Sequence, residues 1–269
     1  MPWIPRGLRD GIVTTRYPRR ADGYDAGFRG SITVRSQLIT DPARRAEDLC
    51  PTGAISLDGD GPRVDRGLCL LCGRCAEVAP DSFGLDEGVE TASVLRRGLV
   101  VPTLLETDEA IQQARNELGR EVRALRRSIH VRHIDIGSDG SDEWEVAALT
   151  NPVYDVQRLG IYFTASPHHA DLLLVTGIGS VGMEGALRET LESLPEPKVL
   201  IAAGVDAISG GLIGAGYASH GGVPEGFAVD VFVPGSPPTP FGLLYGILLA
   251  MGRLPQTTPA GFIATRRRP

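Results

Sequence analysis

The sequence lacks cysteine over most of its length: in this chain of 269 residues, no cysteine follows Cys75. It also lacks a long hydrophobic run, since residues 241–251, the longest candidate, reach about half of the roughly 20 residues that cross a bilayer. No apolar stretch follows the N-terminal MPWIPRGLRD, so no secretory signal is recognisable. The formal net charge of −6 excludes the basic footprint of nucleic-acid binding. We therefore expect a cytoplasmic protein with no transmembrane segment and no nucleic-acid partner, in which clustered cysteines hold metal.

The four cysteines form one recognisable pattern. Cys69, Cys72 and Cys75 are spaced as C-x2-C-x2-C, and Cys50 is followed by proline. This arrangement is typical of a [4Fe–4S] cluster, because thiolates are the soft ligands that iron–sulfur clusters need. We therefore predict one [4Fe–4S] cluster held by Cys50, Cys69, Cys72 and Cys75. A zinc site and buried unligated thiols are the alternatives, although zinc sites usually show two pairs of ligands.

Hydrophobic patterning predicts an α/β unit in the second half of the chain. Strands are expected at 171–176, 198–203 and 229–233, and helices at 184–194 and 241–254. Strands that alternate with helices favour a parallel sheet covered on both faces. Upstream, helical spacing of apolar residues predicts a connector helix over 106–127, capped by Thr107. The expected divisions are a small α+β domain at 1–88, a linker with the connector helix at 89–130, the parallel-sheet domain at 131–256 and a tail at 257–269.

Residues 5–88 resemble the two-cluster bacterial ferredoxin module found in complex I and in the membrane-bound group 4 [NiFe] hydrogenases. The resemblance rests on the cysteine motif, on residues 13–18 (VTTRYP) and on residues 28–30 (FRG). Residues 38–47 (LITDPARRAE) lack the module's first cysteine triplet, and Ala79-Pro80 stands where its second Cys-Pro is expected. The resemblance therefore implies a ferredoxin-like domain in which one cluster is lost and the other is complete.

From Arg132 to about Gly252 the sequence resembles the small, cluster-bearing subunit of the same complexes. The matching stretches are 137–138, 143–149, 155–160, 166–171, 195–198 and 233–238. The resemblance implies a flavodoxin-like domain that holds a [4Fe–4S] cluster through four cysteines. The corresponding positions here are Asp139, Asp142, Asp206 and Ser236. Because none of them is a cysteine, we expect this second cluster to be absent.

If that fold is kept, three carboxylates and a hydroxyl converge where four thiolates stood. Ionised carboxylates are unfavourable together in a low dielectric, so some compensation is required. A hard cation such as Mg2+ or Ca2+, bound water, salt bridges to arginine or protonation would each supply it. We favour a hydrated or collapsed polar pocket over a metal site.

Residues 177–182 (GIGSVG) fit the pattern G-x-G-x-x-G after an expected strand. Asp206 lies a little over twenty residues further on, as the ribose-binding acid of a dinucleotide site does. The family resemblance instead places a glycine-bearing turn here that faces a protein partner. Nucleotide binding is therefore the alternative interpretation of this turn.

These observations and resemblances together imply an iron–sulfur electron-transfer subunit of a hydrogenase-like or complex-I-like oxidoreductase. The first domain would exchange electrons with a redox donor or acceptor protein. The second would be a docking platform for a large catalytic subunit, with any membrane association peripheral and through partners. The alternative is a repurposed active site in which Asp139, Asp142, Asp206 and Ser236 bind a metal ion or substrate.

Overall fold

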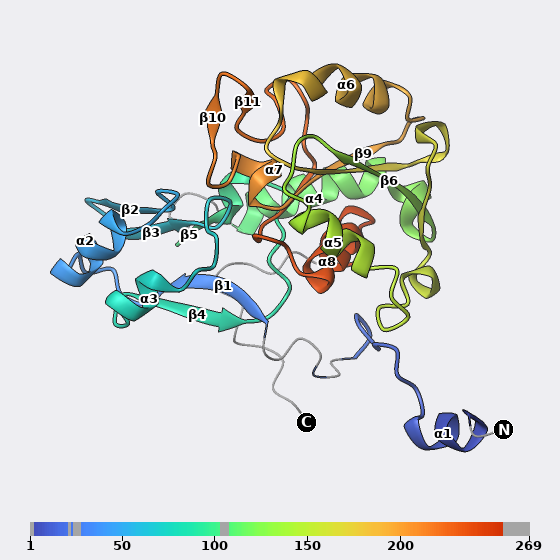
Figure 1. Cartoon of the computed structure of the whole chain (residues 1–269), viewed down its shortest axis with the longest axis horizontal. Coiled ribbons are helices and arrows are strands. Elements are labelled where there is room, and N and C mark those ends of the chain that lie inside the picture. Colours follow the sequence, from blue (N-terminus) through green and yellow to red (C-terminus); the bar gives the residue numbers. More distant parts are fainter. Residues whose placement is uncertain (1–2, 21–22, 24–27, 103–107, 255–269) are drawn as a thin grey trace.

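Five parallel strands form the centre of the larger lobe in the computed structural model, which describes residues 3–20, 23, 28–102 and 108–254 (Figure 1). They are β6 (Ile129–Asp135), β7 (Ile161–Phe163), β8 (Leu172–Thr176), β9 (Val199–Ala203) and β12 (Val231–Val233). Their order across the sheet is β12-β9-β8-β6-β7, with every neighbouring pair parallel. Counted along the chain, this is the 2-1-3-4-5 order of flavodoxin-like sheets. The predicted parallel sheet is therefore confirmed.

Helices cover both faces of this sheet. The helix α8 (Pro240–Ala250) is buried at every position and packs with α5 (Ser141–Ala148) on the first face. On the second face, α6 (Glu184–Glu192) contributes Leu187 to a separate core. Alternate residues of β8 and β9 enter the two cores, which is why LLLVT and VLIAA are apolar throughout. The predicted helices and strands of this region lie within a few residues of the observed ones.

The remaining elements of the larger lobe lie in its loops and at its edge. The connector is α4 (Asp108–Glu121) followed by a 3-10 turn, Arg123–Arg126; its predicted cap, Thr107, lies outside the described residues. A short helix, α7 (Val205–Ser209), follows β9, and a hairpin is formed by β10 (Ala215–Gly216) and β11 (Ser219–His220). Other 3-10 turns are Arg96–Leu99, Val156–Leu159, Pro167–His169 and Val181–Met183.

The smaller lobe follows the order strand, helix, strand, strand, helix, strand. Its elements are β1 (Arg29–Val34), α2 (Asp41–Asp48), β2 (Ile55–Asp58), β3 (Gly61–Asp65), α3 (Arg74–Val78) and β4 (Phe83–Glu87). β1 pairs with β4, and β3 pairs with both β2 and the linker strand β5 (Val100–Val101), all antiparallel. Ile32, Phe83 and Val101 belong to the small core that these elements share.

Backbone, aromatic and side-chain contacts join the two lobes and the segments that flank them. Ser93 exchanges backbone hydrogen bonds of 2.9 and 2.8 Å with Phe232, which extends the parallel sheet by one antiparallel bridge. Tyr17 and Phe28 each pack edge-to-face against Phe241 of α8. Ser209 of α7 donates a hydrogen bond of 2.8 Å to the carbonyl of Gly67, just before the cysteine triplet. The lobes are therefore held together on both sides of the cysteine loop.

The N-terminal helix α1 (Trp3–Asp10) stands away from both lobes and is exposed at every position (Figure 1). In the described part of the chain, no helix combines the length and the apolar character that a membrane crossing requires.

Candidate functional site

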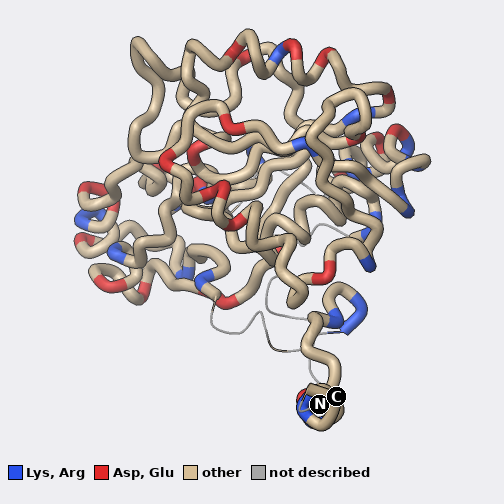
Figure 2. Tube along the Cα trace, turned by 45° about the vertical axis from the view of Figure 1, so that its right-hand side comes forward, with Lys and Arg blue, Asp and Glu red and all other residues tan. Residues whose placement is uncertain are grey.

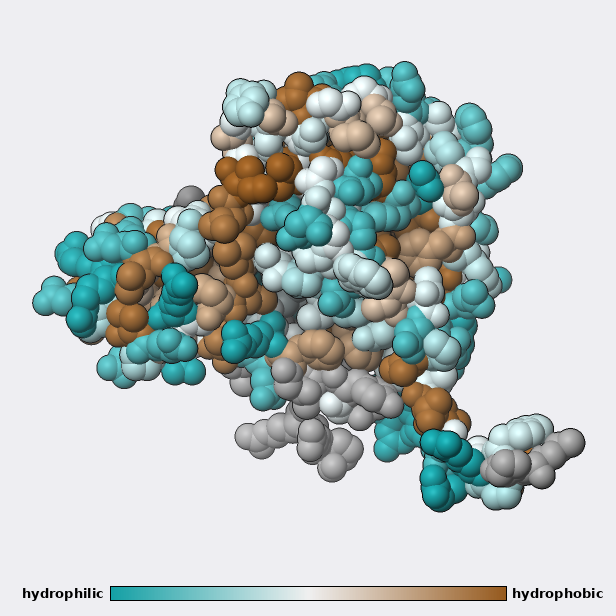
Figure 3. Space-filling view, in the orientation of Figure 1, coloured by the Kyte–Doolittle hydropathy of each residue, from teal (hydrophilic) through white to brown (hydrophobic). Residues whose placement is uncertain are grey.

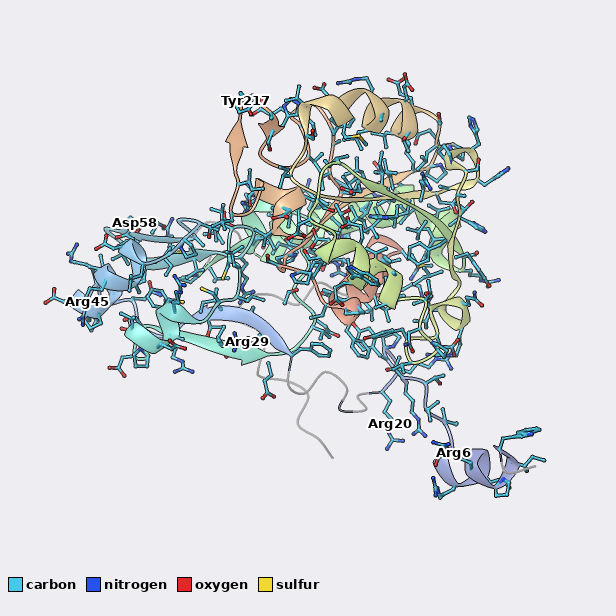
Figure 4. The ribbon with its side chains drawn as sticks, viewed as in Figure 1. Arg6, Arg20, Arg29, Arg45, Asp58 and Tyr217 are labelled. Carbon is cyan, nitrogen blue, oxygen red and sulfur yellow. The ribbon has the colours of Figure 1, made fainter. Side chains whose placement is uncertain are left out.

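The four cysteines line a single apolar pocket in the smaller lobe. Cys50 follows α2, Cys69 and Cys72 lie in the loop between β3 and α3, and Cys75 lies in the first turn of α3. The other side chains of the pocket are mostly aliphatic, among them Ile32, Ala46, Leu49, Val64 and Leu85. Figure 4 shows the sulfur atoms of this lobe gathered between its helices and strands. Residues brought together from three places in the chain therefore present their thiols to one space.

Backbone amides point at two of these sulfur atoms. Ala54 N donates to Sγ of Cys50 at 3.2 Å, and Leu71 N donates to Sγ of Cys69 at 3.4 Å. The loop reaches this geometry through a left-handed residue at Leu71 (φ 55°) and another at Gly73 (φ 82°). Amide donors favour sulfur that carries negative charge. The loop is thus shaped for thiolates rather than for neutral thiols.

Two of the thiols, those of Cys69 and Cys75, have raised pKa values in the absence of a positive partner. Burial, and then repulsion by the other three cysteines, raises the pKa of Cys69 to about 12, although the amide of Leu71 opposes this. Burial likewise raises the pKa of Cys75. Cys72, in contrast, is exposed. Iron would reverse this balance, because a coordinated thiol is deprotonated outright.

Within the described ranges, no three or more His, Cys, Asp or Glu side chains are placed to hold a metal ion. The four cysteines nevertheless line one pocket. The charges of the other three raise the pKa of Cys69, so the four side chains lie near one another. A cluster of four irons is larger than a single ion, so its ligands stand further apart around it. The four thiols and the amides beside two of them are the kinds of donor that a [4Fe–4S] cluster needs, and these cysteines would hold it.

One of the predicted second-cluster positions, Asp142, is a buried acid in the first turn of α5. It is 2% exposed, and its Oδ2 atom makes no hydrogen bond. Burial, and then repulsion by Asp206, raises the pKa of Asp142 to about 8. A side chain at Gly204 (φ 91°) would collide with this carboxylate, so a glycine is required before α7. The acid is therefore seated against the backbone at the start of α7, with one oxygen unpaired.

The structure places Asp206 near Asp142, leaves Asp139 exposed at the edge of this pair, and puts Ser236 elsewhere. Asp206 lies in the first turn of α7, and burial raises its pKa. Asp139 is exposed and accepts a hydrogen bond from Ser141 N at 2.9 Å. Its pKa is lowered by hydrogen bonding first to the side chain and then to the backbone of Ser141. Ser236 is exposed and lines a different cavity. Figure 2 shows acidic residues both in the middle of the view and around its rim.

That cavity, of about 340 Å³, lies between the lobes. It is lined by Cys72 and Leu71 from the cysteine loop, by Arg29, and by Ser236 and Thr239 from the segment that precedes α8. Within the smaller lobe, Arg29 donates a hydrogen bond of 3.4 Å to the carbonyl of Leu71. The exposed edge of the cysteine pocket therefore faces the segment that follows β12.

A polar network beside Asp142 was not predicted from the sequence. Glu143 accepts hydrogen bonds from Ser138 Oγ (2.5 Å) and from Thr176 Oγ1, and Thr176 also contacts Nε2 of His133 at 2.9 Å. Burial opposes ionisation of Glu143, but these hydrogen bonds prevail and lower its pKa. Burial also lowers the pKa of His133. The residues of this network come from separate helices, strands and loops. In the sequence, only the polar and acidic residues near the carboxyl ends of the strands indicate that such a network could form.

The glycine-rich turn at 177–182 is closed by protein rather than open to a nucleotide. The backbone amides of Ile178, Ser180 and Val181 donate to the carbonyls of Gly137, Ile136 and Ala218. A side chain at Gly179 (φ 74°) would collide with the carbonyl of Gly222. Phosphate cradles depend on free amides. The glycines here therefore serve the close approach of the β10–β11 hairpin, and nucleotide binding is not favoured.

The hairpin and the turns beside it carry exposed apolar side chains, here called the hairpin patch: Val181, Leu212, Ile213 and Tyr217. These side chains are 47%, 67%, 71% and 103% exposed, respectively. Figure 3 shows hydrophobic surface running from this region toward the smaller lobe, and Figure 4 places Tyr217 at the outer end of the hairpin. A concentration of exposed apolar groups marks an interaction surface.

Comparison with known proteins gives a consistent result. Formate hydrogenlyase subunit 7 of Escherichia coli (strain K12) is 36% identical over 156 residues, which is 58% of this chain and 60% of that protein. A probable membrane-bound hydrogenase subunit of Pyrococcus furiosus is 36% identical over 128 residues, 48% of this chain and 77% of that one. An NADH-quinone oxidoreductase subunit of Geotalea daltonii is 41% identical over 104 residues, 39% of this chain and 61% of that one. This chain therefore spans about 60% of the length of two of these three relatives.

Among solved structures, a chain of the membrane-bound sulfane sulfur reductase, an archaeal respiratory membrane complex, has 27% sequence identity and a TM-score of 0.43. The match covers 49% of this chain and 74% of that one.

Residues 140–250 match the family described as NADH ubiquinone oxidoreductase, 20 kDa subunit. This range contains β7, β8, β9, β12 and the helices that cover them. The predicted relationship of the second half of the chain is thereby confirmed, while the match does not extend to the cysteine-bearing lobe. Through its larger lobe, the chain belongs to the family of the 20 kDa subunit of NADH ubiquinone oxidoreductase, which includes small subunits of group 4 hydrogenases.

Proposed function

We propose that this chain is an iron–sulfur electron-transfer subunit of a membrane-bound hydrogenase-like or complex-I-like oxidoreductase. The observation that carries the proposal is the convergence of Cys50, Cys69, Cys72 and Cys75 on one apolar pocket with amide donors at the sulfurs. A [4Fe–4S] cluster, when bound, supplies one-electron redox chemistry. The ferredoxin-like relationship of this lobe and the loss of the second cluster are parts of the same proposal.

The residues of this chain have separable roles in that function. The four thiolates would hold the cluster, and the amides of Ala54 and Leu71 would stabilise their charge. Cys72 is the exposed member of the set and lines the cavity between the lobes, so it marks the side from which a redox partner approaches. Aliphatic side chains on the other side of the pocket keep water away.

The larger lobe supports the proposal as a docking platform for a large catalytic subunit. The names of the relatives describe subunits of hydrogenases and of NADH-quinone oxidoreductase. The lobe keeps the family's sheet but carries no cysteine, and its hairpin patch is uncovered in the isolated chain. Membrane association would then be peripheral and would run through the partner subunits.

The docking role is tested by co-expression with a large-subunit homologue from the same host. We expect co-isolation in a 1:1 complex, together with a visible absorbance that dithionite bleaches. The double change Leu212→Asn with Tyr217→Ser should lower recovery of the complex at least about tenfold, because interface hot spots of this kind contribute about 1.4 kcal/mol or more. Leu38→Asn, at a side chain that is 72% exposed on the smaller lobe, is the matched control. If the Leu212→Asn, Tyr217→Ser variant recovers as much complex as the parent, the larger lobe does not dock the large subunit through the hairpin patch.

A further inference from the structure

Asp142 and the cysteine pocket are connected by a single short helix. Oδ2 of Asp142 lies against Gly204, the residue before α7, and Asp206 lies in the first turn of that helix. At the other end of α7, Ser209 donates to the carbonyl of Gly67 at 2.8 Å. A methyl group added to Gly67 would stand 2.9 Å from Ile208 of the same helix. Because Gly67 is two residues before Cys69, the buried acid and the cysteines flank opposite ends of α7.

The groups that act on the Asp142 carboxylate are all acidic. They are Asp206 on α7, Glu143 on α5, Asp139 in the loop before α5 and Asp135 at the end of β6. His133 and Thr176 are directed at Glu143 instead. The carboxylate has an unpaired oxygen and little contact with water. A proton is the cation that such a site can bind without any rearrangement.

We propose that Asp142 takes up a proton when the group held by the four cysteines accepts an electron. The inference rests on the proposed function, because it requires a redox group in that pocket. One electron arrives from an external one-electron donor, either dithionite or a reduced partner protein. One proton moves from solvent to the Asp142 carboxylate, entering past the half-buried Asp206. The added negative charge is thereby neutralised, and no other bond forms or breaks.

The sign of the effect follows from electrostatics. An added negative charge strengthens proton binding at a nearby carboxylate, and proton binding equally favours reduction. In an effective dielectric of about 20, an added unit charge changes a proton affinity by up to about tenfold once it lies beyond about 12 Å, and by more when it lies nearer. A tenfold change corresponds to about 59 mV for a one-electron couple. Burial already raises the pKa of Asp142 to about 8, so the response falls at or above that pH.

The test is a redox titration of the anaerobic, iron-loaded full chain at several pH values between about 6 and 10, a window that brackets the raised pKa of Asp142. The midpoint potential of the parent should become more negative by about 59 mV in total across this range. Asp142→Asn should abolish the dependence, because an amide cannot take up the proton. Asp139→Asn removes a neighbouring but exposed carboxylate and should leave the dependence in place.

Two results would overturn the inference. One is a parent potential that is independent of pH while the iron content and the spectrum of the reduced protein are normal. The other is a pH dependence that persists in Asp142→Asn. Neither result would contradict the proposal that the four cysteines hold a [4Fe–4S] cluster. If instead the protein binds no iron and shows no redox signal, the proposed function itself fails, and the inference fails with it.

Discussion

Cys69→Ser is expected to remove most of the iron from the chain and to destabilise the smaller lobe by about 3 kcal/mol or more. Ligand binding and folding are coupled in small lobes pinned by metal, so loss of one ligand removes the stabilisation that the whole group provides. Cys69 is the thiol whose pKa burial raises furthest, to about 12, so its ionisation depends most on a bound cation. Iron analysis and thermal unfolding under anaerobic conditions measure both effects.

The same substitution in metal-free protein is the matched control. There the thiol is neutral, and exchanging sulfur for oxygen in a partly buried position should change stability by about 1 kcal/mol or less. A large loss in the metal-free protein would mean that Cys69 acts through packing alone. Full iron content in Cys69→Ser would contradict its role as a ligand.

The second large effect concerns Asp142. A carboxyl with a pKa of about 8 in the folded chain and about 3.9 in the unfolded chain costs stability as pH rises between these values. Below about pH 4 both states are protonated and no cost exists. Above about pH 8 the cost reaches its limit, at most about 6 kcal/mol. Asp142→Asn should therefore stabilise the chain by about 2–4 kcal/mol near pH 8 and by almost nothing near pH 4, as measured by denaturant unfolding.

Asp139→Asn provides the comparison for this experiment. Its carboxylate is exposed, and an asparagine oxygen can still accept the hydrogen bond from Ser141 N, so stability should change by less than about 0.5 kcal/mol. A bound Mg2+ or Ca2+ would give the opposite pattern. Asp142→Asn would then destabilise the chain, and EDTA would destabilise the parent to a similar extent.

The parts of the fold that were predictable have strong local signals. The buried strands β8 and β9 are continuous apolar runs, and α8 is apolar around its whole circumference. The sequence of β6 (IHVRHID), in contrast, mixes histidine and arginine with apolar residues because its carboxyl half is only partly buried. β7 has three residues, and α5 buries only Asp142 and Val146. Tertiary contacts, not local pattern, form these elements.

The same distinction holds for the sites. The cysteine spacing is a local signal, so the set Cys50, Cys69, Cys72 and Cys75 could be predicted, and the structure places all four around one pocket. The prediction that Asp139, Asp142, Asp206 and Ser236 lie together required loops from separate strands to meet at one edge of the sheet. Asp142 and Asp206 do meet there, but the hydrogen bond from Ser141 N to Asp139 directs that side chain to solvent. A resemblance to a family indicates where a residue lies in the chain, but it does not indicate that a local hydrogen bond turns the side chain outward.

The most direct test of the central claim is iron and acid-labile sulfide analysis of the anaerobically purified chain, combined with electron paramagnetic resonance after dithionite reduction. We expect about four irons and about four sulfides per chain and the signal of one isolated [4Fe–4S]+ centre. One zinc per chain with no sulfide would contradict this expectation. About eight irons with two interacting spins would contradict it equally, because the larger lobe would then hold a cluster without a cysteine.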